Sequence, residues 1–467
     1  MLFASIPPEI VHCILIEAVR ARGRKRAARL RLVSREWDAA VEDAIFDSGI
    51  LDENDFIAGG RFEGRMDMSF WQRYLAYRTL HHSKPLSLRL AMIRQVAEQM
   101  AEMKDPGADE PDRRQTVRYF VSEICHAVLV FRGIGGDGLH SYLAPATGTP
   151  ILFNRTCINF RRAILAAAAY MNEVGIAHKL IAQCSSATTV DTPLDTETYA
   201  NTPLFFPELY SAAAYKGNEE FISYLHKNES ELTIRSSNNR AIIIYSAIWG
   251  NQMGALELGL GSTSIADVQT FIASGLSRTT SVDMFRHCFK LLNGNVQHPS
   301  RARDATYEWK WRLSRFHDAA ERGAVELMEY LAQLGASVNG RFSDEERKFC
   351  SPISQAALNG HEDAVRWLLN RDAALDCSLH AAVAGGSRSI VQLLIEHGAC
   401  RNEVVVRRAV VEAVKRENEG LFRLLVAAHG RLDMETIEEA SKIAEAEELV
   451  SMKRLLQEDL LDGVEVN

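Results

Sequence analysis

Apolar residues recur along this chain in pairs of short helical runs that are joined by a glycine. In the stretch SPISQAALNGHEDAVRWLL, Ala357 lies three residues before Gly360, and an apolar triplet at 367–369 follows the glycine. Apolar residues spaced by three and four share one face of a helix. A glycine between two such runs can adopt the left-handed conformation that ends the first helix. The pattern therefore predicts helical hairpins with small residues where two helices meet.

The same arrangement recurs along much of the chain. The positions that define it are Ala214, Gly217, Gly250, Ala320, Gly323, Ala357, Gly360, Ala382 and Gly386. Asn172 and Glu417 take the place of the glycine in two poorer copies. The glycine spacings are 33, 73, 37 and 26 residues, so the long interval indicates a degenerate copy within residues 263–300. Because one hairpin cannot bury its apolar face alone, we expect an all-α solenoid of about seven to eight stacked repeats, some of them degenerate.

The pattern resembles ankyrin repeats, whose unit reads roughly T-P-L-H-x-A-A-x-x-G-H before an apolar triplet and Gly-Ala. Ser351-Pro352-Ile353 stands in the T-P-L position, and Leu379-His380 and Phe316-His317 stand in the L-H position. The likeness covers about residues 160–430 and is strongest over 315–400. It implies an ankyrin-repeat solenoid at 155–465 whose concave face binds a client protein. The C-terminal segment METIEEASKIAEAEELVSMKRLL is acidic and helical in pattern, and we expect it to close the last repeat as a helical cap.

The first fifty residues follow a different pattern. Two amphipathic segments, one around Ile10 and one around Trp37, are separated by the basic stretch RARGRKRAAR. Seven of the twelve residues from Arg20 to Arg31 are basic. Such a stretch fits either a nuclear-import or nucleic-acid patch or, as we favour, the solvated face of a helix.

This N-terminal segment resembles an F-box, a three-helix module of about 45 residues. The likeness rests on I-P-P-E-I at residues 6–10, L-R-L-V-S-R-E-W at 30–37, and Phe46. It departs at Ile6, where leucine is usual, and at the basic stretch, which replaces the usual middle turn. F-boxes dock on the Skp-type adaptor of cullin–RING ubiquitin ligases. The resemblance implies a docking surface formed by Ile6, Pro7, Pro8, Ile10, Leu32, Val33 and Trp37. The alternative is a helical cap on the array without an adaptor role. Filamentous-fungal proteins that join such a segment to ankyrin repeats are similar over the whole chain.

Residues 51–150 are expected to form a helical connector with mobile loops that packs onto the first repeat. Its helical segments are interrupted by KDPGADEPDRR and by the glycine-rich loop at 133–138. This loop satisfies G-x-G-x-x-G, but a dinucleotide site also needs a helix that opens at the last glycine and an acidic residue about 20 positions later. Here Pro145 interrupts, and the next acidic residue after Asp137 is Glu173. We therefore predict a plain loop and no cofactor.

The pair His361-Glu362 is the other candidate for chemistry. A metal-binding H-E-x-x-H helix would need a second histidine at position 365, which is valine. His361 is better explained as a residue at the start of a helix, and His317 and His380 as hydrogen-bonding positions inside repeats. We predict no catalytic, cofactor-binding or metal-binding residue and classify the protein as a non-enzyme.

Composition narrows the class of protein further. The chain has 467 residues, of which 47% are hydrophobic and 24% charged, and its net charge of −8 gives no overall attraction to nucleic acid. No apolar run approaches the length of a membrane span. The eight cysteines form no C-x-x-C pair, which favours a reducing compartment, cytoplasmic and/or nuclear.

The sequence thus predicts a non-catalytic protein-interaction protein. One interpretation is a substrate-recruiting subunit of a Skp–cullin–F-box ubiquitin ligase, with the N-terminal module on the adaptor and the repeats on a client. The alternative is an ankyrin-repeat scaffold or inhibitor with no ubiquitin link. The client, the pathway and the oligomeric state stay open.

Overall fold

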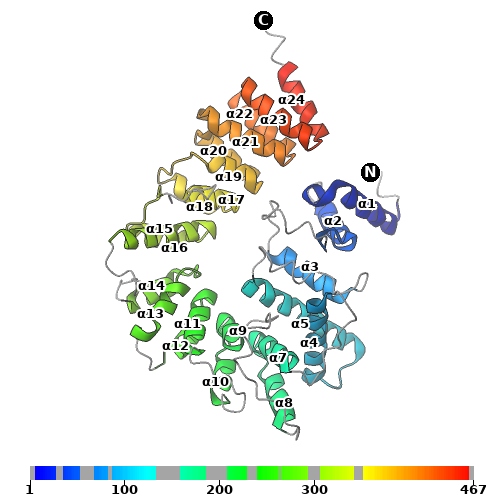
Figure 1. Ribbon diagram of the computed structural model, residues 1–467, viewed down its shortest axis with the longest axis vertical. Coiled ribbons are helices and arrows are strands. Elements are labelled where there is room, and N and C mark those ends of the chain that lie inside the picture. Colours follow the sequence, from blue (N-terminus) through cyan, green and yellow to red (C-terminus); the bar gives the residue numbers. More distant parts are fainter. Residues whose placement is uncertain are drawn as a thin grey trace. The chain divides into compact units, whose positions relative to one another are not determined.

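Every regular element in the described part of the chain is helical (Figure 1). The computed structural model describes residues 6–27, 35–52, 68–81, 87–132, 158–185, 208–228, 239–261, 265–292, 305–340 and 351–461. The chain divides into two compact units, residues 1–264 and 265–467. This division falls within the array expected at 155–465, so the continuity of that array stays a prediction.

The first unit begins with helices that precede the hairpins. They are α1 (Pro8–Ala27), α2 (Arg35–Ser48), the 3₁₀ helix η2 (Ile50–Asp52), α3 (Met68–Leu80), α4 (Leu88–Lys104) and α5 (Glu110–Arg132). Helix α1 packs on α2, and α3 and α4 both pack on α5.

Helix α1 starts where the sequence predicts it. The Pro7 carbonyl accepts hydrogen bonds from the backbone N–H groups of Ile10 and Val11 at 3.0 and 3.1 Å, and Pro8 is the first helical residue. Proline suits this position because its missing N–H has no partner there in any helix. The helix continues to Ala27 and so includes much of the basic stretch that separates the two amphipathic segments. Arginine, lysine and alanine are good helix formers, and the single Gly23 does not end the helix.

The N-terminal helices share a core with the connector. Phe46 of α2 lies 5.4 Å from Phe70 and 5.2 Å from Tyr74 of α3, measured between ring centroids. Asp47 accepts hydrogen bonds from the Tyr77 hydroxyl and from His12 of α1, the latter at 2.7 Å. A domain boundary at residue 50, as the sequence suggests, would therefore separate Phe46 from the rings of Phe70 and Tyr74 on which it packs.

The connector packs on the first hairpin, as α4 contacts both of its helices. Lys104 Nζ lies 2.5 Å from Glu173 Oε1, and Lys179 Nζ donates to the Met103 carbonyl at 2.6 Å. The linker between α4 and α5 is shorter than the sequence suggests, because α5 already begins at Glu110. Acidic residues in a first turn interact favourably with the helix dipole.

Helical hairpins form the rest of the described part of both units. In the first unit they are α7 (Ile158–Met171) with α8 (Val174–Ser185), α9 (Leu209–Lys216) with α10 (Glu219–Lys227), and α11 (Asn239–Gly250) with α12 (Met253–Leu260). In the second unit they are α13 (Ile265–Gly275) with α14 (Val282–Leu291), α15 (Ala305–Glu321) with α16 (Val325–Gln333), α17 (Pro352–Leu358) with α18 (Glu362–Leu369), α19 (Ser378–Gly385) with α20 (Arg388–Glu396), α21 (Glu403–Lys415) with α22 (Glu419–His429), and α23 (Met434–Ala446) with α24 (Val450–Leu461); the 3₁₀ helix η5 (Ala399–Arg401) precedes α21.

Each unit is built in two layers. The first helices of successive hairpins contact one another, as in the series α7, α9, α11 and the series α15, α17, α19, α21, α23. The second helices contact one another in the same way. Each hairpin therefore buries its apolar face against its neighbours, as expected for a solenoid.

Most hairpins share one backbone turn. In each of these hairpins the residue that ends the first helix has a left-handed backbone conformation. In chain order, these residues are Asn172, Gly217, Asn251, Gly323, Gly360, Gly386, Glu417 and Glu448. The backbone N–H of the next residue donates a hydrogen bond to the carbonyl five positions earlier. This carbonyl lies at the end of the helix, where carbonyl groups have no hydrogen-bond partner within the helix itself. These bonds run from Glu173 to Ala168, Asn218 to Ala213, Gln252 to Ala247, Ala324 to Ala319, His361 to Ala356, Ser387 to Ala382, Asn418 to Ala413 and Leu449 to Ala444. Alanine is the acceptor at each of these turns.

Gly250 departs from the turn geometry that the sequence predicts for it. It is the last residue of α11, and the left-handed residue is Asn251, one position later. A Cβ atom on Gly250 would lie 1.9 Å from the Tyr215 carbonyl oxygen of α9. The glycine is therefore required by a close approach of two helices and not by backbone conformation.

The degenerate copy expected within 263–300 coincides with α13 and α14. Its turn, Leu276–Ser281, has no left-handed residue, and the Gly275 carbonyl accepts from the N–H groups of Arg278 and Thr279. The helices persist there although the turn differs.

Overpacking the first-helix layer tests the register of the repeats. Ala357 is fully buried in α17, which packs on α19, and a Cβ on Gly385 of α19 would lie 2.9 Å from the Ala357 carbonyl oxygen. We expect Ala357→Leu to destabilise the second unit by about 1–3 kcal/mol. Urea unfolding of the full chain measures this, with Ala428→Leu on the exposed side of α22 as the control. Equal stability of Ala357→Leu and the parent would show that the register is wrong.

Candidate protein-interaction surfaces

His361 links neighbouring hairpins. Its Nε2 lies 2.9 Å from the carbonyl oxygen of Glu321, the last residue of α15, which belongs to the preceding hairpin. Its ring also lies over Gly323, where a Cβ atom would be 2.6 Å from the imidazole Cγ. The histidine therefore contacts an open helix end and a left-handed glycine of the neighbour. This contact explains the Gly-His pair that the sequence shows at this point.

Asn218 makes the equivalent contact in the first unit. Its side-chain amide donates to the carbonyls of Ala169 and Tyr170, in the last turn of α7, at 2.7 and 2.9 Å. Asn218 and His361 both directly follow the left-handed residue of their own hairpin. Two different side chains therefore serve one structural position.

The other repeat histidines also bond inside the fold. His317 Nε2 lies 2.9 Å from the Gly340 carbonyl, and His380 Nε2 lies 3.5 Å from Glu412 Oε2. Within the part of the chain that the structure describes, no group of three or more His, Cys, Asp or Glu residues could hold a metal ion. The glycine-rich loop at 133–138 lies outside the described residues.

The predicted adaptor surface is partly visible on α1. Pro7 and Pro8 are exposed, Ile6 is half-buried, and Ile10 is 51% exposed. Trp37 of α2 is half-buried, whereas Leu32 and Val33 lie outside the described residues. Ile14, which sequence reasoning did not include, is 46% exposed and lies one turn after Ile10. Ile10 and Ile14 share a side of α1, and Pro7 directly precedes this helix. We call these three residues the α1 face.

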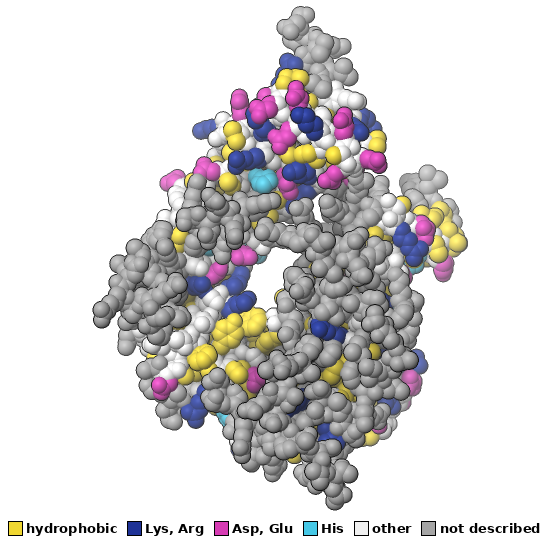
Figure 2. Space-filling view, viewed as in Figure 1, with side chains coloured by type: hydrophobic (Ala, Val, Ile, Leu, Met, Phe, Trp, Pro, Cys, Tyr) yellow, Lys and Arg dark blue, Asp and Glu magenta, His cyan; other side chains and the backbone are white. Residues whose placement is uncertain are grey.

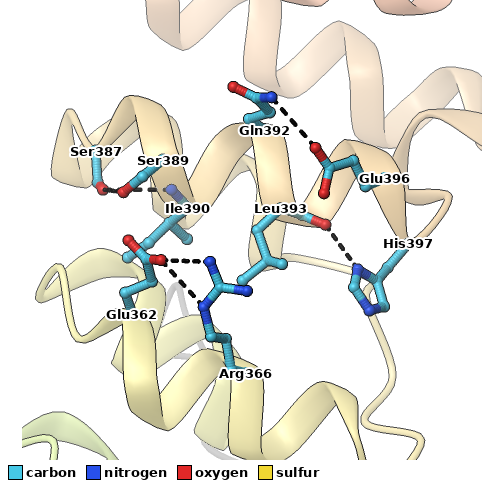
Figure 3. Close-up of polar contacts among 9 residues, drawn as sticks. All are labelled: Glu362, Arg366, Ser387, Ser389, Ile390, Gln392, Leu393, Glu396 and His397. Carbon is cyan, nitrogen blue, oxygen red and sulfur yellow. Dashed lines mark hydrogen bonds and ion pairs between the residues drawn. The ribbon is translucent and has the colours of Figure 1, made fainter.

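The second-helix layer of the second unit offers a polar surface (Figure 3). On α18, Arg366 pairs with Glu362 at 2.6 Å, and on α20, Gln392 donates to Glu396 at 3.2 Å. His397 Nδ1 lies 2.8 Å from the Leu393 carbonyl. These contacts each join residues four apart. Glu362 also makes a side-chain hydrogen bond with Ser389 of α20, so this layer combines contacts along a helix with contacts between hairpins.

The first-helix layer of the same unit is charged and its groups bond between hairpins. Arg407 of α21 lies 3.3 Å from Asp433 and 2.5 Å from Glu435 of the next hairpin. Burial opposes ionisation of Glu412, but its contacts with His380 and Arg416 prevail and lower its pKa to about 2. Glu412 is therefore ionised at neutral pH.

Comparison with known families identifies the repeats of the second unit. The family model described as ankyrin repeats (three copies) matches residues 316–405 and again residues 353–436. The second unit contains ankyrin repeats. Ankyrin repeats indicate a role in protein–protein interaction. No curated protein matches the chain. In the described part of the chain, no helix combines the length and the apolar character needed to cross a membrane.

The first unit carries the same left-handed turns as the ankyrin repeats, but its first-helix layer is aromatic. Phe131 of α5, Tyr215 of α9 and Trp249 of α11 are half-buried, and their ring centroids lie 5.3–5.4 Å apart. Tyr245 lies 6.2 Å from Trp249 and is half-buried too. We call these four residues the aromatic surface. Figure 2 shows hydrophobic side chains gathered over α9 and α11.

Tyr170 is buried beside the aromatic surface and packs against Tyr215. It is 1% exposed, and its ring is stacked against that of Tyr215 at 6.5 Å. Its hydroxyl lies 2.6 Å from His126 Nδ1 of α5. Burial raises the pKa of Tyr170 and lowers that of His126, so both groups are neutral at neutral pH. Lys216 Nζ lies 4.8 Å from the Tyr170 ring centroid and 3.6 Å from Glu123 Oε2.

Sequence reasoning missed the aromatic surface, although a signal was present. Tyr170, Tyr215 and Trp249 each lie two residues before the left-handed residue of their hairpin. The equivalent ankyrin-repeat positions are Glu321, Leu358, Ala384 and Lys415. An aromatic residue in three consecutive copies therefore distinguishes the first unit from the second.

Proposed function

We propose that this protein is a non-catalytic substrate-recruiting subunit of a ubiquitin ligase. In this proposal the α1 face docks on a Skp-type adaptor and the first helices of the repeats hold a client. The single observation that carries it is the exposure of Ile10 and Ile14 beside Pro7. Large apolar side chains gathered on one exposed face are typical of a protein-interaction site. The resemblance of residues 6–10 to an F-box opening names the adaptor as the partner.

The division of the fold supports two separate interactions. The α1 face lies before the connector, whereas the ankyrin repeats lie in the second unit. Phe46, Asp47 and His12 fix α1 and α2 on α3, so the face is presented by a packed part of the first unit. A scaffold or inhibitor with no ubiquitin link would use the repeats but would not need this face.

Charge substitution on the α1 face tests the adaptor. We expect Ile10→Asp with Ile14→Asp to weaken binding of a purified Skp-type adaptor at least about tenfold, because an interface side chain of this kind contributes about 1–4 kcal/mol. Isothermal titration with the full chain measures this. Point variants are preferable to removal of residues 1–50, which would uncover Phe70 and Tyr74.

Val404→Asp is the matched control, because Val404 is also 51% exposed but lies on α21. It should leave adaptor affinity unchanged. If the parent protein does not bind the adaptor, or if the α1 variant binds as well as the parent, the ligase proposal is wrong and an interaction protein without a ubiquitin link stands.

A further inference from the structure

Helix α1 has an exposed side and a packed side. Ile10 and Ile14 lie on the exposed side, whereas Leu15 and Val19 are buried. His12 lies seven residues before Val19, and residues seven apart share one side of a helix. His12 therefore lies on the packed side, where its Nε2 is 2.7 Å from Asp47 Oδ2 of α2. This contact fixes α1 from the side opposite to Ile10 and Ile14.

Asp47 connects this histidine to α3. One of its carboxylate oxygens contacts His12, and the other accepts a hydrogen bond from the Tyr77 hydroxyl. The Tyr77 ring lies 5.4 Å from that of Phe46 and is stacked on that of His81 at 4.2 Å. Hydrogen bonds to a carboxylate are among the stronger ones in proteins. A single half-buried side chain thus joins three helices.

Helix α3 is held in place by further contacts with its neighbours. Arg73 donates through Nε and Nη2 to the two carboxylate oxygens of Glu42 of α2, at 2.7 and 3.0 Å. Gln72 donates to the Ser122 carbonyl of α5 at 3.1 Å, and Trp71 is buried. An arginine–carboxylate pair with two hydrogen bonds restricts geometry more than a single contact does. Helix α3 is therefore a fixed support for α2 and, through Asp47, for α1.

We infer that α3 belongs to the adaptor-binding unit and that Tyr77 is a positioning residue for the α1 face. Tyr77 lies outside this face and acts through Asp47 and His12, which hold the packed side of α1 and so direct Ile10 and Ile14 outward. The identity of the partner rests on the proposed function. The inference extends the adaptor-binding unit beyond the first fifty residues into α3.

Tyr77→Phe tests this inference in the full-length protein. The substitution removes the hydroxyl that bonds to Asp47 but keeps the ring that packs on Phe46 and His81. We expect the backbone amides of α1 to exchange with solvent about threefold faster or more, and the Kd of a purified Skp-type adaptor to rise by a similar factor. Hydrogen exchange read by mass spectrometry and isothermal titration measure the two effects.

A second variant separates positioning from a general loss of stability. His12→Ala removes the other contact of Asp47, so in the double variant its effect on adaptor affinity should not add to that of Tyr77→Phe. Two unrelated losses would add. Tyr119→Phe is the matched control, because Tyr119 is exposed on α5, and this variant should behave like the parent.

Hydrogen exchange needs no adaptor, so the two proposals can fail separately. If the parent does not bind the adaptor, the ligase proposal is wrong, and faster exchange in α1 of Tyr77→Phe still supports the positioning of the face. The positioning role is overturned if Tyr77→Phe leaves exchange in α1 unchanged, if it leaves the affinity of a bound adaptor unchanged, or if its effect adds to that of His12→Ala.

Discussion

Gly250→Ala is expected to destabilise the first unit by about 3 kcal/mol, at the upper end of typical overpacking effects. The added Cβ would lie 1.9 Å from the Tyr215 carbonyl oxygen and 2.7 Å from its carbonyl carbon. These are backbone atoms, so α9 and α11 must separate, and Tyr215 and Trp249 must move apart with them. Hydrogen exchange of the amides of α9 and α11 in the full chain measures the loss.

Gly175→Ala is the matched control for this effect. Gly175 lies in α8, and a Cβ atom there would meet no heavy atom within 4 Å. Alanine should leave stability unchanged or raise it by up to about 1 kcal/mol, because glycine is a poor helix former. Equal exchange rates in the two variants would contradict the close approach of α9 and α11.

Glu412→Gln is expected to destabilise the second unit by about 2–3 kcal/mol at neutral pH and to change its acid stability. Burial opposes the charge of Glu412, but contacts with His380 and Arg416 lower its pKa from 4.5 to about 2. Because the pKa is lowered in the folded state, this stabilisation is present above pH 4.5 and disappears as the pH falls toward 2. The difference in stability between parent and variant should therefore close over that interval.

Urea unfolding at a series of pH values from neutral to acid measures this difference. Glu435→Gln is the matched control, because Glu435 also pairs with an arginine but its side chain is 73% exposed. Exposed pairs contribute about 0–1 kcal/mol, so this variant should resemble the parent. The assignment is wrong if the effect of Glu412→Gln does not depend on pH.

The hairpin turns were largely predictable because they leave a signal in each copy. The sequence places Asn172 and Glu417 at the glycine position, and both are left-handed in the structure. Gly250 shows the limit of this reasoning. A glycine can be required for a left-handed backbone or for the lack of a Cβ atom, and the sequence does not distinguish these needs. Only the distance from Gly250 to Tyr215 separates them.

The aromatic surface was less predictable because it depends on packing between distant segments. Tyr215 and Trp249 can be aligned through the repeat, but Phe131 belongs to α5 and reaches them only because the connector packs on the first hairpin. The α1 face was predictable in part. Helical spacing from Ile10 includes Ile14, whereas its exposed fraction depends on how α1 packs against α2.

The contacts of His361 and Asn218 also bear on how the array unfolds. Each side chain binds carbonyl groups at the end of the preceding hairpin's first helix, groups that the helix itself leaves open. When one hairpin opens, its neighbour loses these partners together with its apolar cover. Part of the folding free energy thus belongs to the junction and not to either hairpin, as in a one-dimensional chain of coupled units. Such coupling makes a partly open array less stable than either end state, so neighbouring repeats tend to be lost together.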